Sequence, residues 1–491
     1  MSPTLVLTLL PALGAVLLLV PHRAPSWSRN TATLTTALTF CLSLGWAHLL
    51  ALPFISLLAL GTVLATPRQS SRRGALATLL LTQSAAMGFF GATHLVAALL
   101  FFIAMTVLPD LHLSHEPGSA RPRGAVRVYL LIGTAPLGVA TLLLGWLGWS
   151  PALGALLLVG LCTRLAVVPL HTWLPVWMAR SPWGSGPLWM SLAASLHLLH
   201  HWLLPLLPPE WVTDTVVPAL ASLGAGTALY GALLAFSQKD LRRMLAFTVM
   251  SQSGLMLTGV ASTNPEGIHG AWLHCLAAGV AFTGLDLLVR SVEARTGTTD
   301  LEQLGGLTER APRMATLFLL LCLAAMGLPG TLGFVSEDLL LRATLGAHPW
   351  HLLLLPPALA LNAFTLLRAC HRAFLGPTPS GRGPLQDLLP RERWMATALV
   401  LTVIVGGLAP PALPRSLATP EPGPPSTPLS RALVPTPGAG ARKDPSGIPP
   451  QRAYREPESS RNRRERHVPG ERTEGAGRCS RGDPAARVWR L

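Results

Sequence analysis

The stretch Val167-Val-Pro-Leu-His-Thr-Trp-Leu-Pro175 places a histidine and a tryptophan between two prolines in a strongly apolar region, and Arg164 stands three residues before it. A proline inside a membrane-spanning helix removes a backbone hydrogen bond. Such a break is tolerated in lipid only where protein or a water-filled cavity satisfies the freed carbonyl groups. The stretch therefore predicts a broken helix whose exposed backbone faces the protein interior.

The composition indicates an all-α polytopic membrane protein. Half of the 491 residues are hydrophobic, 12% are charged, and the mean hydropathy is +0.45. Apolar runs of roughly 17 to 25 residues, the length that crosses a bilayer, recur as far as residue 413 and predict about fourteen transmembrane helices. They cover approximately residues 3–20, 31–50, 51–66, 74–91, 94–111, 126–147, 151–175, 184–206, 215–236, 243–261, 269–291, 313–346, 350–374 and 395–412.

A second interruption occurs at Met326-Gly-Leu-Pro-Gly330, in the twelfth span, five spans after the first. Spans four to eight and nine to thirteen would then be two inverted five-helix repeats, each with a broken helix in the same place. Paired interruptions in corresponding places of two repeats indicate an ion path.

Basic residues set the expected orientation. Lys and Arg follow every odd-numbered span, whereas the connections between them, such as 148–151 and 208–215, have none. Because cytoplasmic loops collect Lys and Arg, we expect a multi-pass protein of the cell inner (plasma) membrane with both termini outside.

No cofactor, metal site or redox centre is expected in this chain. The cysteines within apolar spans stand singly and form no CxxC pair, and neither GxGxxG nor GxxxxGK[ST] occurs. Residues 414–491 are rich in Pro, Gly, Ser and Arg and are expected to be a disordered basic tail. This tail could bind acidic lipid or a partner, but a solvated tail without a partner is the simpler interpretation. No nucleic acid is expected, because aromatic residues do not alternate with the basic ones.

Three segments resemble the antiporter-like membrane subunits of respiratory complex I, with bacterial NADH-quinone oxidoreductase chain M as the nearest type. Subunits of Mrp-type cation/proton antiporters and of membrane-bound hydrogenases share the pattern. The resemblance covers about residues 70 to 376. The segments are 164–175 (RLAVVPLHTWLP), 235–254 (AFSQKDLRRMLAFTVMSQSG) and 328–337 (LPGTLGFVSE).

The resemblance implies a proton relay, from which this chain departs at three of four positions. The family has a glutamate in the fifth helix, a lysine in the seventh, a lysine in the eighth, and a glutamate or lysine in the twelfth. These positions are Ala104, Arg164, Ser195 and Glu337 here. A buried lysine can release its proton, whereas a guanidinium stays protonated, so Arg164 can hold charge or order water but cannot pass on a proton.

Other polar residues could carry a rerouted relay. His197, His200 and His201 are spaced i, i+3 and i+4 and share one helix face in the eighth span. They are either relay residues or histidines packed between helices; a metal site is the least supported alternative. His171 lies at the first break, where it would either satisfy a freed carbonyl or transfer a proton.

Two candidates lie in the eleventh span. Asp286 is four residues before Arg290, which predicts an internal ion pair, with proton relay as the alternative. His274 lies one turn before a histidine position of the family, now Ala278, and could substitute for it.

Glu337 is the strongest candidate, because an acid within the membrane is costly unless it is used or paired. The alternative for Glu337 is a salt bridge to Arg342 or Arg368.

The resemblance and the hydropathy together divide the chain into four parts: N-terminal transmembrane helices (1–73), a proton-conducting antiporter-like core (74–376), a loop with the last transmembrane helix (377–413), and the tail (414–491). The expected function is ion translocation, with the proton as the expected ion, by a membrane-arm subunit of an NADH-quinone oxidoreductase. As an enzyme it would act only as part of that translocase, beside other membrane-arm subunits in the bilayer. A non-conducting structural subunit, and a subunit of an Mrp-type antiporter or membrane-bound hydrogenase, are the alternatives.

Overall fold

The computed structural model describes residues 3–20, 26–46, 50–66, 73–115, 122–147, 150–377 and 385–410. Within these ranges the chain is helical, and its one strand-like feature is an isolated bridge between Asp240 and Asp300. The expected tail, residues 414–491, lies outside the described residues.

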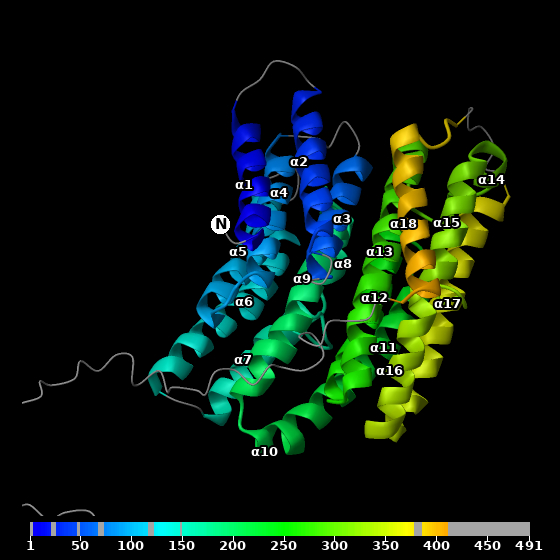
Figure 1. The fold of residues 1–491 in the computed structure, drawn as a ribbon. Helices are drawn as coiled ribbons and strands as arrows, with labels where there is room; N and C mark the ends of the chain where they lie inside the picture. The colour runs from blue at the N-terminus through cyan, green and yellow to red at the C-terminus, as the bar shows by residue number, and fades with distance from the viewer. Residues whose placement is uncertain are drawn as a thin grey trace, which may run out of the picture. The chain divides into compact units, whose positions relative to one another are not determined.

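Figure 1 shows the order of the helices along the chain. Two π-helical turns, η2 (Leu198–Leu203) and η4 (Val212–Val216), adjoin α9 and α11, and a third, η6 (His371–Leu375), follows α17. The helices are α1 (Pro3–Leu19), α2 (Trp27–Leu44), α3 (Ala51–Ala65), α4 (Arg73–Phe90), α5 (Leu95–His115), α6 (Pro122–Leu147), α7 (Pro151–Arg164), α8 (Trp173–Arg180), α9 (Gly186–His197), α10 (Pro209–Trp211), α11 (Val217–Ser237), α12 (Leu241–Ala261), α13 (Pro265–Thr296), α14 (Leu307–Arg310), α15 (Pro312–Ala325), α16 (Leu332–Ala347), α17 (Leu355–Cys370) and α18 (Pro390–Leu408).

Five helical segments of the described chain are long and apolar enough to cross a membrane: Leu95–Leu113, Pro209–Ser237, Leu241–Ala261, Pro265–Thr296 and Pro349–Leu375. Shorter apolar helices, of 10 to 17 residues, include Thr4–Leu19, Ala51–Ala65 and Pro151–Arg164. The count of fourteen spans stays a prediction.

Both expected breaks are confirmed. α7 ends at Arg164, turns occupy residues 165–172, with a cis peptide bond between Val168 and Pro169, and α8 begins at Trp173. The second break separates α15 from α16. There Gly327 and Gly330 adopt φ of 69° and 91°, a conformation that costs glycine little and other residues more.

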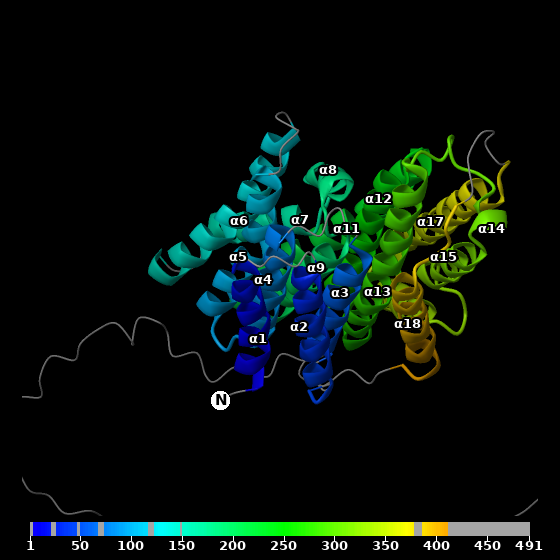
Figure 2. The same ribbon diagram turned by 90° about the horizontal axis from the view of Figure 1, so that it is seen from above.

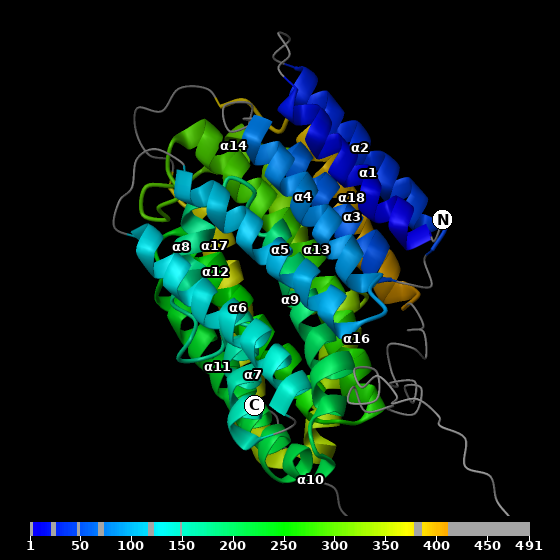
Figure 3. The same ribbon diagram turned by 90° about the vertical axis from the view of Figure 1, so that its left-hand side faces the viewer.

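The two central helices are buried on all sides. In the most apolar 18-residue stretch of each helix, 94% of the residues of α12 and 100% of those of α13 are buried. α12 contacts α8, α11, α13 and α16, while α13 also contacts α3, α9, α15 and α18. Figure 2 shows α12 and α13 between α7 and α9 on one side and α15 and α17 on the other, and Figure 3 shows α1 and α2 beside α4 at one edge. Polar side chains on α12 and α13 are therefore shielded from lipid.

α11 and α12 approach each other closely because small residues face each other. A Cβ atom on Gly254 would lie 2.6 Å from the Gly224 oxygen, and one on Gly231 would lie 2.8 Å from the Ser251 nitrogen. Small residues allow such contact between membrane helices. The contact fixes the position of residues 251–254 relative to α11.

Candidate functional site

Arg164, at the end of α7, is a buried cation with few partners. Its side chain is only 3% exposed. It donates a hydrogen bond to the Thr134 hydroxyl of α6, and the guanidinium carbon lies 6.0 Å from the centre of the Phe102 ring of α5. Its Nε has no hydrogen-bond partner among the described residues. Asp110 of α5 is near enough for its charge to act on Arg164. The first break therefore holds a fixed positive charge.

The three altered family positions contain no proton-carrying pair. Ala104 packs against the hydrophobic core. The hydroxyl of Ser195 donates to the Ser191 carbonyl of its own helix at 2.8 Å, so it serves its own backbone. Aromatic contacts continue from Phe102 to α9: the ring centroids of Phe102 and Phe89 are 5.9 Å apart, and those of Phe89 and His197 are 5.7 Å apart. The side-chain contacts that link Arg164 to His197 in this way are apolar.

Side chains of neighbouring helices satisfy the backbone freed at the first break. The hydroxyl of Ser253 on α12 donates to the Leu165 carbonyl at 2.7 Å, and the Val168 amide donates to the Thr227 hydroxyl of α11 at 3.2 Å. These contacts join the break at the end of α7 to α11 and α12. They supply the hydrogen-bond partners that irregular backbone needs where water is absent from the membrane interior.

His171 lies within the same break, 8% exposed. Its ring meets the Tyr230 ring of α11 edge-on, with centroids 5.5 Å apart. In the described part of the chain, its Nδ1 has no hydrogen-bond partner. His171 is thus a buried imidazole with an unused ring nitrogen.

His274 of α13 lies between the two halves of the core. Its Nε2 lies 2.5 Å from Oε1 of Gln252 on α12, and its Nδ1 lies 3.0 Å from Oγ of Ser336 on α16. The Ser336 hydroxyl also reaches the Gly333 carbonyl at 2.7 Å. Neutral His274 can donate from Nε2 and accept from Ser336. Protonated His274 can donate from both nitrogens while Ser336 donates to Gly333, so both states are satisfied.

Glu337 follows Ser336 directly and lies against the second break. A Cβ atom on Gly327 would meet the carboxyl carbon of Glu337 at 2.8 Å. The alternative of a salt bridge to Arg342 or Arg368 is wrong. Arg342 pairs with Asp338, four residues away, at 2.9 Å, and Arg368 donates to the Gln238 carbonyl. Within the described ranges, Glu337 has no ion-pair partner.

Residues 251–253 connect these places, and the sequence interpretation gave them no role. Besides Gln252 and Ser253, the Ser251 hydroxyl donates to the Ala228 carbonyl of α11 at 2.6 Å and accepts from the Asn362 amide of α17 at 2.7 Å. We call the Leu165 carbonyl, Ser253, Gln252, His274 and Ser336 the central polar band. The signal that could have found it is the rarity of Gln and Asn inside membrane helices.

The three histidines of the eighth span do not form one unit. The rings of His197 and His201 stack, with centroids 4.9 Å apart and planes inclined by 17°. His200 takes no part in a ring contact in the described structure. No group of three His, Cys, Asp or Glu residues suited to a metal ion occurs among the described residues.

The ion pair between Asp286 and Arg290 is confirmed. Arg290 Nε donates to Asp286 at 2.8 Å, and both side chains are about 5% exposed or less. Arg290 also donates to the carbonyls of Ser181 and Pro182, in the connection from α8 to α9. The pair therefore fastens α8, the second half of the broken helix, to α13.

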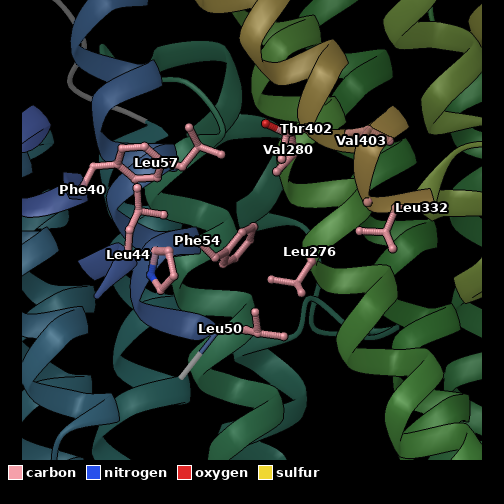
Figure 4. A pocket seen from close by; sticks show the side chains of 12 residues that line it. Phe40, Leu44, Leu50, Phe54, Leu57, Leu276, Val280, Leu332, Thr402 and Val403 are labelled. Atoms are coloured by element: carbon pink, nitrogen blue, oxygen red, sulfur yellow. The ribbon is translucent and has the colours of Figure 1, made fainter. Parts of the chain in front are cut away.

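An apolar cavity of about 240 Å³ lies between α2, α3, α13, α16 and α18 (Figure 4). The Thr402 hydroxyl donates to the Ala398 carbonyl of its own helix. The cavity offers no charged group for a cofactor or an ion. Its lining residues are Phe40, Leu44, Leu50, Pro53, Phe54, Leu57, Leu276, Val280, Leu332, Thr402, Val403 and Gly406.

Comparison with known proteins identifies the family. Residues 126–361 match the family model described as NADH:quinone oxidoreductase/Mrp antiporter, transmembrane. NADH-quinone oxidoreductase subunit 13 of Thermus thermophilus is 31% identical over 386 residues, which cover 74% of this chain and 79% of that relative. F(420)H(2) dehydrogenase subunit M of Methanosarcina mazei is 29% identical, and the match spans about half of each protein: 52% of this chain and 51% of the relative.

A solved structure has the same fold. A chain of respiratory complex I from Thermus thermophilus with bound NADH superposes with a TM-score of 0.76 at 26% identity, over 87% of this chain and 98% of that chain. The two breaks, the buried central helices and these likenesses agree. This chain belongs to the NADH:quinone oxidoreductase/Mrp antiporter transmembrane family.

Proposed function

We propose that this chain is the ion-translocating membrane-arm subunit of an NADH-quinone oxidoreductase, in which electron transfer in partner subunits drives protons across the membrane. The family and the similarity to subunit 13 of the Thermus thermophilus enzyme support this function. Its partners are other membrane-arm subunits and the lipid bilayer. The chain itself would hold no redox centre.

The proposal includes the architecture expected from the sequence. About fourteen spans form two inverted five-helix repeats within residues 74–376, preceded by helices in 1–73 and followed by 377–413 and the tail, 414–491. Both termini face the outside of the inner membrane. The two interrupted helices, α7–α8 and α15–α16, support this arrangement.

The observation that carries the proposal is the central polar band, which consists of two hydrogen-bonded groups on successive residues of α12: Ser253 with the Leu165 carbonyl at the first break, and Gln252 with His274 and Ser336 towards α16. We assign His274 as the proton carrier of the band, because both of its protonation states find hydrogen-bond partners. Arg164 supplies a fixed charge at one end, and Glu337 is the exit group at the other. His171, with its unused Nδ1, is the second candidate carrier at the first break. Asp286 is a structural partner of Arg290 in this scheme.

One observation favours a second function, a structural subunit that no longer conducts. The contacts that link Arg164 to His197 run through the apolar rings of Phe102 and Phe89, and Ala104 and Ser195 replace charged residues of the family pattern. In that case the fold would serve only to dock between neighbouring subunits.

The test is redox-driven proton translocation by the reconstituted complex carrying Glu337→Gln. We expect a loss of at least tenfold in protons moved per electron, with assembly unchanged. Asp338→Asn is the matched control, because Asp338 is 43% exposed and paired with Arg342, and it should leave translocation unchanged. Equal translocation by the wild type and Glu337→Gln would reject the exit role and favour the structural subunit.

A further inference from the structure

The π-helical turn η2 brings His197 and His201 into contact. α9 ends at His197, and η2 continues the same helix over Leu198–Leu203. π-Helical turns are rare and are frequent at functional sites. Here the two imidazole planes are nearly parallel, 17° apart, at a centroid separation of 4.9 Å.

Aromatic rings from two other helices enclose His197. Its ring centroid lies 5.7 Å from Phe89 and 5.1 Å from Phe90 of α4, and 6.0 Å from Trp272 of α13. The His201 ring contacts Trp202 at 5.2 Å. We call these four aromatic residues, Phe89, Phe90, Trp202 and Trp272, the aromatic box. A cation within about 6 Å of such rings is attracted to their faces.

The box supplies no acid to its histidines. Neither His197 nor His201 forms a hydrogen bond or ion pair with another described side chain, and the ring contacts of His197 with α4 and α13 are with Phe89, Phe90 and Trp272. The titratable groups that act on His197 are His200 and His201. One proton on the stacked pair would lie close to these aromatic rings, whereas a second would be repelled by a like charge 4.9 Å away.

We infer that His197 and His201 form one proton-binding site that holds a single proton shared between the two rings. Binding forms one N–H bond on either imidazole, and release breaks it, with no electron transferred. His197 lies two residues and His201 six residues beyond Ser195, where the family pattern has a lysine, so the pair supplies a proton-binding group to a helix that lacks that lysine. Its use in translocation rests on the function proposed above.

The first test counts protons and does not depend on translocation. The ¹⁵N spectrum of the histidine-labelled complex is compared with that of the double variant His197→Phe/His201→Phe while the pH is lowered through about 6.5, where histidine ordinarily titrates. The difference should show two neutral rings that together gain one proton. Two independently protonated rings, or two rings that stay neutral while the complex remains assembled, would overturn the single-site inference.

His200→Phe is the matched control, because His200 belongs to η2 but not to the stacked pair. Although His200 acts on His197, this variant should still show the pair gaining one proton, and a loss of that signal equal to the loss in the double variant would contradict the assignment.

The second test asks whether the site is used. Since the two rings act as one unit, each single variant should lower protons per electron as much as the double variant does. Independent losses that add up in the double variant would overturn the shared site. If the wild-type complex moves no protons, the proposed function fails, while the ¹⁵N titration still decides whether the pair binds one proton.

Discussion

The imidazole of His274 and the amide of Gln252 lie 2.5 Å apart, Nε2 to Oε1, although they belong to different central helices. On the other side of the ring, Ser336 stands beside the exit candidate Glu337. A buried polar group costs free energy unless it has a hydrogen-bond partner. These contacts therefore help to fix the positions of α12, α13 and α16 relative to one another, in addition to packing.

Ser336→Ala should lower proton translocation by at least severalfold, because it removes the hydroxyl that meets His274 Nδ1 at 3.0 Å. The loss of this buried hydrogen bond should also destabilise the chain by about 1–3 kcal/mol. Ser195→Ala is the control, since that buried hydroxyl bonds only to its own helix at Ser191. Redox-driven proton uptake in proteoliposomes distinguishes the two variants. Equal effects would remove Ser336 from the relay.

Gly254→Ala should separate α11 from α12 and disturb the central polar band. The added methyl group would lie 2.6 Å from both the Ala228 nitrogen and the Gly224 oxygen, which are backbone atoms that cannot rotate away. We expect a loss of about 1–3 kcal/mol, typical of overpacking, and reduced translocation. Gly226→Ala, on α11 with nothing within 4 Å of the new methyl, should be neutral or slightly stabilising. Thermal unfolding of the purified complex measures both variants, and similar midpoints would contradict the packing argument.

The breaks were predictable because Pro and Gly act locally on backbone geometry. Local spacing also predicted the pair of Asp286 with Arg290, four residues apart. The same rule explains the wrong alternative for Glu337: Asp338, and not Glu337, is four residues from Arg342. The start of α2 was placed too late, at residue 31 instead of Trp27. The first turns of α2 contain many polar residues. Their hydroxyl groups can nevertheless be buried, because hydroxyls such as that of Thr35 donate hydrogen bonds to carbonyls of the same helix.

The central polar band could not be predicted from spacing. Ser336 and Gln252 are 62 and 22 residues from His274 along the chain. Their meeting depends on the relative height of three helices, which close glycine contacts and the second break determine. His274 was visible beforehand as a relay candidate, and Gln252 as a polar residue inside an apolar span, but neither had an assigned partner.

Asp286→Asn should destabilise the chain by about 3–5 kcal/mol, because it leaves the guanidinium of Arg290 buried with an uncompensated charge. Arg290 would retain its bonds to the carbonyls of Ser181 and Pro182, which hold the end of α8. Asp338→Asn removes an equally spaced but exposed pair and should cost at most about 1 kcal/mol. The unfolding midpoints of the assembled complex provide the measurement. If the Asp286→Asn and Asp338→Asn variants had the same unfolding midpoint, the buried pair would not be what holds α8 in place.

Phe102→Ala should make the membrane leak protons in the absence of electron transfer. Phe102 and Phe89 are both at most 1% exposed and form successive contacts that link Arg164 to His197. Removing the Phe102 ring leaves a cavity beside the Arg164 guanidinium, so water can enter where an apolar side chain excluded it. The substitution should also cost about 3–5 kcal/mol of stability, as large-to-small core changes do.

Phe318→Ala separates leakage from instability. Phe318 is equally buried and packs against Phe374 at 4.9 Å, on α15 and η6, where none of the candidate relay residues lies. It should lose similar stability without any leak. Passive proton flux into proteoliposomes under an imposed pH gradient gives the comparison. A leak in both variants would mean that loosened packing alone admits protons. No leak in either variant would mean that the Phe102 ring is not the barrier to proton flux.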